Sequence, residues 1–206
     1  MYLVKNPSFF KLIYPSLTWE IKTKQKVLHL TFDDGPIPEV TPYVLDCLRK
    51  YNAKATFFCI GDNVRKHPSI YKQIIDEGHQ VGNHTYNHLN GWKTNTKDYL
   101  HNIHQCNQFV ESTLYRPPYG RITRKQIKEY HKQFPSNKII MWDVLSGDFD
   151  LHINDEQCYQ NVVKNSKNGS IVVFHDSLKA LPRLEMALPR ALEYWTNQGY
   201  RFDTIK

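Results

Sequence analysis

The sequence predicts an α/β fold in a single domain, built on a mostly parallel sheet. Short apolar runs alternate along the chain with segments in which apolar residues recur at helical spacing. Polar residues suited to chemistry come directly after several of the apolar runs, where catalytic groups sit in parallel sheets. The 206 residues can bury a substantial core and fit one domain.

The first half of the chain reads as alternating strands and helices. A strand is expected over 27–32, where β-branched and aromatic residues run up to a Gly-Pro breaker. A helix is expected over 40–51, followed by a strand over 55–60. Another helix is expected to end at Gly78, and a short strand precedes His84.

The second half carries clear signals for helix ends. Three residues suited to cap helix N-termini precede later helices, namely Asn95, Thr123 and Asn154. The last helix is expected to begin at Pro189 and to end at Gly199, because Pro suits the first turn and Gly the C-terminal end. The tail over 200–205 is expected to form a final strand.

Two adjacent carboxylates, Asp33 and Asp34, follow the first strand within the segment Thr-Phe-Asp-Asp-Gly-Pro. Two acids at the mouth of a strand are costly to desolvate and repel each other unless a cation or a proton separates them. The pair therefore raises the hypothesis of a metal ion with further ligands elsewhere in the chain.

His84 and His88 are candidates for those ligands. Residues four apart lie on one face of a helical turn, and two such imidazoles with one carboxylate suit a small divalent ion. Alone the pattern is weak, because the chain has ten His and two surface or capping histidines after the Gly82-Asn83 turn would look the same. Together with the Asp pair, the metal site is the better interpretation.

Three further segments carry candidate groups. Arg116 opens a loop stiffened by two prolines, which can fix an Arg and a backbone N–H in place. Segment 142–149 follows an apolar run and places acids where that strand should end, and the apolar run 171–174 leads into His175. Each also has a plain structural reading, respectively a proline turn, a polar strand exit and a capping His.

In this order the five segments resemble the motifs of the polysaccharide deacetylase family, the NodB-homology carbohydrate esterases. The resemblance covers 26–206, which leaves 1–25 as an N-terminal extension expected to pack on the domain. The first three motifs match closely, whereas Phe149 and Val173 stand where the family has Trp and Leu in its acetyl-methyl pocket. The resemblance implies a distorted (β/α) barrel with about seven strands.

The resemblance also implies a metal-assisted hydrolysis. Asp34, His84 and His88 would bind a divalent ion, Zn²⁺ or another transition metal such as Co²⁺ or Ni²⁺. Such an ion lowers the pKa of a bound water and polarises a carbonyl. Asp33 would be the general base, and Arg116 would keep it ionised and oriented.

The remaining roles implied by the resemblance concern the oxyanion and the leaving group. The backbone N–H of Tyr119 would hold the oxyanion with the metal. His175 would protonate the departing amine, with Asp148 fixing its ring and favouring its charged form. The implied reaction removes N-acetyl groups from N-acetylglucosamine-containing glycans, such as peptidoglycan, chitin-like or precursor oligosaccharides, and releases acetate.

Two alternatives stay open on the same scaffold. One is an amidase acting on formamide or cyclic-amide small molecules, and the other is a catalytically silent glycan-binding domain. The silent domain is disfavoured because the base, the three ligands and the acid are all present. Trp92 is the better candidate for the wall of a sugar subsite, whereas Trp142 is expected to pack in the core.

Composition narrows the partners and the compartment. The net charge of +7 is spread along the chain, so nucleic-acid binding is not expected. No apolar run is long enough to span a bilayer, and the N-terminus does not resemble a signal peptide. We therefore expect a cytoplasmic protein with four reduced, mostly buried Cys. Association with the cell envelope stays open, because the apolar residues within 9–14 suit either core cover or contact with a membrane surface.

Overall fold

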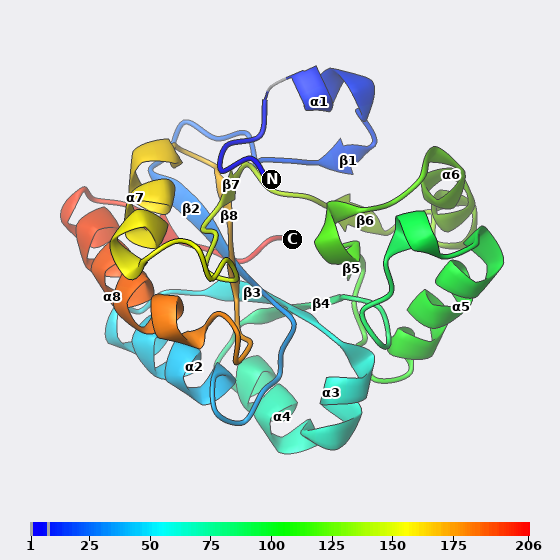
Figure 1. The fold of residues 1–206 in the computed structure, drawn as a ribbon, viewed down its shortest axis with the longest axis horizontal. Coiled ribbons are helices and arrows are strands. Elements are labelled where there is room, and N and C mark those ends of the chain that lie inside the picture. Colours follow the sequence, from blue (N-terminus) through cyan, green and yellow to red (C-terminus); the bar gives the residue numbers. More distant parts are fainter. Residues whose placement is uncertain (1, 8) are drawn as a thin grey trace.

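The computed structural model describes residues 2–7 and 9–206 and confirms the distorted barrel of α/β type (Figure 1). Eight strands form one curled sheet in the order β1-β6-β5-β4-β3-β2-β8-β7, and β9 pairs with β2. All of these pairings are parallel. The strands are β1 (Leu17–Thr18), β2 (Val27–Asp33), β3 (Ala55–Cys59), β4 (Gln80–Asn83), β5 (Leu114–Tyr115), β6 (Lys138–Ile140), β7 (Val144–Leu145), β8 (Ile171–His175) and β9 (Arg201–Phe202).

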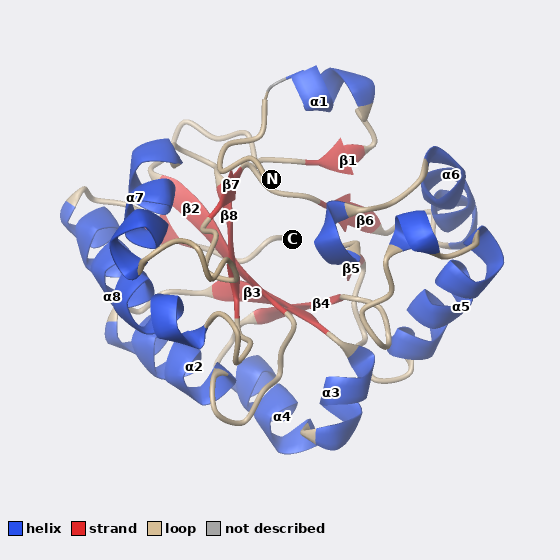
Figure 2. Cartoon of the chain, viewed as in Figure 1, coloured by secondary structure: helices blue, strands red, loops and turns tan. Residues whose placement is uncertain are grey.

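Helices surround the strands on the outside of the curled sheet (Figure 2). Two short 3₁₀ turns, η1 (Gly91–Lys93) and η2 (Pro118–Gly120), lie in the connections. None of the helices in the described residues is long and apolar enough to cross a membrane. The helices are α1 (Phe9–Ile13), α2 (Thr41–Lys50), α3 (Gly61–Lys66), α4 (Pro68–Asp76), α5 (Thr96–Asn107), α6 (Arg124–Gln133), α7 (Asp155–Asn165) and α8 (Leu181–Asn197).

Strand β2 lies inside the sheet and brings Asp33 to the edge where the parallel strands end. All seven of its residues are buried, and it pairs on its two sides with β3 and β8. The parallel register places Asp33, the last residue of β2, level with His175, the last residue of β8. The carboxylate and the imidazole therefore meet at one end of the sheet without any loop to position them.

The core beneath that edge is tightly packed and aromatic. The Phe32 ring stacks on those of Phe57 and Phe174, with ring centroids 5.1 and 6.0 Å apart. These three side chains are at most 1 % exposed. Each buried side chain of this size stabilises the fold by roughly 1.5–3 kcal/mol, so the strands that end in Asp33 and His175 share a rigid base.

The N-terminal segment contributes to the barrel. Strand β1 pairs with β6, and Lys5 forms an antiparallel bridge with Val144 of β7. The segment therefore contacts both ends of the open sheet and spans the gap between them. Within 9–14, Phe10 stacks on Trp19 with ring centroids 5.8 Å apart, whereas Leu12 is exposed. The division of the chain at residue 26 stays a prediction.

The helix caps expected at Asn95, Thr123 and Asn154 are present. The Asn95 side chain accepts a hydrogen bond from the backbone N–H of Asp98, and the other two residues form capping boxes. The four Cys are buried and free.

The expectation that the last helix begins at Pro189 was wrong. Helix α8 starts at Leu181 with Pro182 in its first turn, and Pro189 lies inside it. A proline inside a helix removes one hydrogen bond, but the helix continues because Leu184, Leu188 and Leu192 bury a continuous face against the core.

Candidate active site

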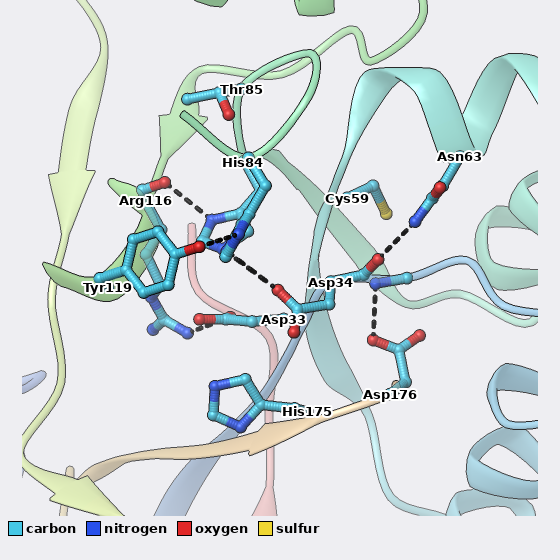
Figure 3. A network of polar contacts seen from close by, with 12 residues as sticks. Asp33, Asp34, Cys59, Asn63, His84, Thr85, Arg116, Tyr119, His175 and Asp176 are labelled. Atoms are coloured by element: carbon cyan, nitrogen blue, oxygen red, sulfur yellow. Dashed lines mark hydrogen bonds and ion pairs between the residues drawn. The ribbon is translucent and has the colours of Figure 1, made fainter. Parts of the chain in front are cut away.

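Three side chains converge beyond the ends of β2 and β4. Asp34 follows β2 directly, and His84 follows β4. Asp34 Oδ1 lies 3.7 Å from His84 Nε2 and 3.2 Å from His88 Nε2 (Figure 3). One oxygen and two nitrogens thus face one another within 4.8 Å, which is the arrangement expected of ligands around one ion.

The expected helical turn over 84–88 is absent, although the two imidazoles do meet. Thr85 and His88 adopt left-handed backbone conformations, with φ of 65° and 61°. The loop is held by side chains instead, because Asn83 Oδ1 accepts the N–H of Thr85 and Asn102 Oδ1 accepts that of Tyr86. Spacing alone therefore identified the pair but not the backbone that presents it.

The chemistry of the three ligands fits a divalent ion. Asp34 Oδ1 is buried and accepts no hydrogen bond within the described residues. Nδ1 of His84 lies 2.8 Å from the carbonyl oxygen of Arg116, so Nδ1–H donates there and the Nε2 lone pair faces Asp34. A fixed tautomer and an unsatisfied carboxylate oxygen are what a metal site requires before the ion binds.

Protonation in this trio also suits metal binding. Burial lowers the pKa of His84 to about 4 against the opposing pull of the two carboxylates, so the ring is neutral at physiological pH. Burial alone would raise the pKa of Asp34, but the neighbouring imidazoles of His88, His175 and His84 hold it well below its usual range. Neutral imidazole and ionised carboxylate are the ligating forms.

Arg116 holds Asp33 from one side. Its Nη1 donates to Asp33 Oδ1 and to Thr31 Oγ1, both at 2.7 Å. Its other nitrogens donate to the carbonyl oxygens of Ile140 and Met141, at 3.3 and 3.0 Å. The guanidinium is fully buried and also lies 4.1 Å from the centroid of the Phe58 ring. With all these contacts made, it cannot turn away from Asp33.

His175 forms the opposite wall and is paired with Asp148. Its ring Nδ1 and its backbone N–H each lie 2.7 Å from an oxygen of the Asp148 carboxylate. Arg183 in turn donates to the backbone carbonyl of Asp148. Burial alone would lower the pKa of His175, but Asp148 next to it and the two carboxylates across the site raise it to about 9. The ring is therefore protonated at neutral pH, with Nε2–H free to donate.

Tyr119 lies at the rim of the site. It adopts a φ of 60° in η2, and its side chain is 59 % exposed. Its hydroxyl lies 3.1 Å from His88 Nδ1, a contact that the sequence did not predict. The hydroxyl can fix the tautomer of His88 as the Arg116 carbonyl does for His84.

The two positions that depart from the family pattern differ in their surroundings. The Phe149 ring lies edge-on to His175, with centroids 5.1 Å apart, and the Tyr2 ring also packs against it. Val173 is buried within β8. Phe149 thus contacts His175 directly, whereas Val173 lies two residues before His175 on the same face of β8.

The two tryptophans also differ. Trp142 is half-buried and packs over Gly120, where an added Cβ would lie 2.5 Å from the indole. Trp92 is 64 % exposed, with its Nε1–H directed to the carbonyl oxygen of Ile122. The exposed indole is thus fixed in place, as a sugar-stacking wall requires.

Sequence reasoning missed Asp176, Asn63 and Thr41. Asp176 directly follows His175 and is fully buried, and burial raises its pKa to about 8. Asn63 Nδ2 donates to the backbone carbonyl oxygen of Asp34 (Figure 3). An acidic residue directly after a buried strand was the available signal for Asp176, whereas nothing in the local pattern marks Asn63.

Comparisons with known proteins agree with this geometry. The profile of the polysaccharide deacetylase family matches residues 20–134. A peptidoglycan-N-acetylglucosamine deacetylase from Bacillus cereus is 37 % identical over 194 residues, which cover 92 % of this chain and 91 % of the relative. The peptidoglycan-N-acetylmuramic acid deacetylase PdaC from Bacillus subtilis is 31 % identical over 191 residues. The matched region covers 90 % of this chain and 39 % of PdaC.

A solved structure shares the whole architecture. The crystal structure of a peptidoglycan N-acetylglucosamine deacetylase in complex with 4-naphthalen-1-yl-N-oxidanyl-benzamide superposes with a TM-score of 0.86 at 33 % identity. The match covers 97 % of this chain and 95 % of that one. The chain belongs to the polysaccharide deacetylase family of NodB-homology carbohydrate esterases and is a polysaccharide deacetylase.

Proposed function

We propose that this enzyme is a metal-dependent N-deacetylase of peptidoglycan, which hydrolyses the acetamide of N-acetylglucosamine residues and releases acetate. The observation that carries the proposal is the unsatisfied, buried Asp34 Oδ1 facing two imidazole nitrogens between a base and an acid. The names of the relatives support peptidoglycan as the substrate class, with N-acetylglucosamine in one relative and N-acetylmuramic acid in another.

Asp34, His84 and His88 would hold the ion. Two imidazoles and one carboxylate suit Zn²⁺, Co²⁺ or Ni²⁺. When bound, the ion supplies Lewis acidity to the acetyl carbonyl and to the attacking water.

Asp33 would take the proton of the attacking water. Its Oδ1 is occupied by Arg116, whereas its Oδ2 takes part in no hydrogen bond within the described residues and is free to accept. Because Arg116 is buried and immobile, it fixes the orientation of this carboxylate and keeps Oδ2 in place for the attacking water. General base catalysis of this kind contributes about 10²- to 10⁴-fold.

His175 would deliver a proton from Nε2 to the departing nitrogen. Its Nδ1–H points to Asp148, so Nε2–H faces the space shared with Asp33 and Asp34. Water adds to the acetyl carbon, the C–N bond breaks, and the sugar amine leaves with the proton of His175 while acetate remains. The backbone N–H of Tyr119 would stabilise the oxyanion formed in between.

The test is acetate release from defined fragments, with mass spectrometry to locate the free amine. Muropeptides, glycan strands and N-acetylglucosamine oligomers are compared at equal concentration with Zn²⁺ added. We expect release from peptidoglycan fragments, with the amine on N-acetylglucosamine. Turnover of formamides or cyclic amides, with none on any glycan, would contradict the proposal and favour a small-molecule amidase.

A further inference from the structure

The metal-ligand candidate Asp34 has a strained backbone. Its φ is 86°, in the region that residues other than glycine rarely adopt. Such a conformation is unfavourable and persists only where the surroundings hold it. Neighbouring groups must therefore supply that restraint.

Hydrogen bonds hold the peptide units on both sides of Asp34, and Figure 3 shows those to the unit that follows it. The backbone N–H of Asp176 donates to the carbonyl oxygen of Asp33 at 3.0 Å. Asn63 Nδ2 donates to the carbonyl oxygen of Asp34 at 2.7 Å. The N–H of Gly35 donates to Asp176 Oδ1 at 3.0 Å. The orientation of Asp34 is thus set by two side chains that do not face the ion.

The Asp176 carboxylate is itself fixed. It is fully buried, and its Oδ2 accepts the hydroxyl of Thr41 at 2.6 Å. That hydroxyl oxygen accepts the backbone N–H of Ile37 at 2.8 Å, which ties the carboxylate to the start of α2. Asp176 therefore links β8, the Asp34 segment and α2.

Gly35 makes room for this carboxylate. A Cβ built on Gly35 would lie 1.9 Å from Asp176 Oδ2, closer than any real contact. The glycine in the first motif is thus required by the aspartate that follows the last motif.

We propose that Asp176 and Asn63 are positioning residues that hold Asp34 in its left-handed conformation, so that its carboxylate faces His84 and His88 before the ion binds. The inference rests on the metal site of the proposed function. Removing either hydrogen-bonding side chain lets the Asp34 segment relax. Part of the free energy of metal binding is then used to restore the ligand geometry, so the affinity for the ion falls. Residues that orient metal ligands typically account for 10- to 100-fold in metal affinity.

The experiment measures the dissociation constant for Zn²⁺ by competition with a chelating dye, in the absence of substrate. Asn63→Ala and Asp176→Ala are expected to weaken binding about 10- to 100-fold. Asp176→Asn keeps an oxygen that can accept the Gly35 N–H, so its loss is expected to be smaller than that of Asp176→Ala.

Thr56→Val is the matched control. It removes an equally buried side-chain oxygen, which accepts the N–H of Ile205 and has no contact with Asp34, and it should leave Zn²⁺ affinity unchanged. If the two single variants Asn63→Ala and Asp176→Ala fold and bind Zn²⁺ with wild-type affinity, the inference is overturned.

Two further results keep the test decisive. If Asp176→Ala fails to fold, Asn63→Ala decides the test alone. Asn63 is only half-buried, so removing its side chain leaves the core intact. If the wild-type chain itself binds no Zn²⁺, Co²⁺ or Ni²⁺, the proposed metal site is refuted, which is a different result from equal affinities in wild type and variants.

Discussion

Replacing Asp148 by asparagine tests the acid assigned to His175. The Asp148 carboxylate lies 2.7 Å from Nδ1 of His175, and with the other carboxylates it raises the pKa of that ring from 6.5 to about 9. This difference corresponds to about 3 kcal/mol of stabilisation of the imidazolium. Without Asp148 only Asp33 and Asp34 oppose the lowering effect of burial, so the pKa of His175 in Asp148→Asn should fall below the wild-type value of about 9.

The direct assay is a proton NMR titration of the His175 ring in the ion-free protein. The pH profile of acetate release provides the second readout. Because His175 donates its proton, activity is lost as the pH rises through its pKa, and the alkaline limb of the profile should move to lower pH in Asp148→Asn. An unchanged ring pKa, or an alkaline limb that stays in place, would refute the assigned pair.

The free energy of unfolding should also depend on the His175–Asp148 pair, and the effect should be larger at low pH. A pKa raised in the folded state contributes stability that is complete below 6.5, the unfolded value, and is lost as the pH rises through about 9. Asp148→Asn should therefore lower the free energy of unfolding more at pH 6 than at pH 10, as measured with urea. An equal loss at both pH values would mean that the variant only disrupts packing.

Three further predictions concern the base, its partner and the subsite. Asp33→Asn should lower kcat at least about 100-fold, with Zn²⁺ affinity retained; loss of the metal would mean that the roles of Asp33 and Asp34 are exchanged. Arg116→Lys cannot satisfy the four acceptors around the guanidinium, so thermal unfolding should show a loss of about 3–5 kcal/mol; a wild-type melting temperature would contradict this account. Trp92→Ala should raise KM for glycan oligomers without releasing metal, and an unchanged KM would remove the exposed indole from the site.

The sequence was sufficient to predict the parts of the molecule that depend on local pattern. Strand β2 was predicted because its apolar run ends at a Gly-Pro breaker, and three helix caps were predicted from residue type. The convergence of Asp33 and His175 followed from parallel strands whose ends meet at one edge. These features need only short-range preferences and one topological rule.

The rest depends on contacts between distant segments. The loop that presents His84 and His88 is set by Asn83 and Asn102, and the spacing of the two histidines resembled a helix. The contribution of β1 depends on its pairing with a strand more than one hundred residues later in the chain. Pro189 resembled a helix start, because periodicity alone does not show that both sides of the proline bury one face.

Asp176 and Asn63 show the same limit within the site itself. Their importance lies in hydrogen bonds to the backbone around Asp34, and no side-chain pattern in sequence reports a backbone φ of 86°. The sequence reflects this arrangement only at Gly35, where the neighbouring Asp176 leaves no room for a Cβ.

The measurement that tests the central claim most directly is reconstitution of activity with metal. The protein is stripped with a chelator, dialysed, and assayed for acetate release from peptidoglycan fragments while Zn²⁺ is titrated in. We predict no release from the stripped protein and full activity at one ion per chain, with no recovery in His84→Ala. Undiminished release from stripped protein shown to be free of metal would refute the metal dependence.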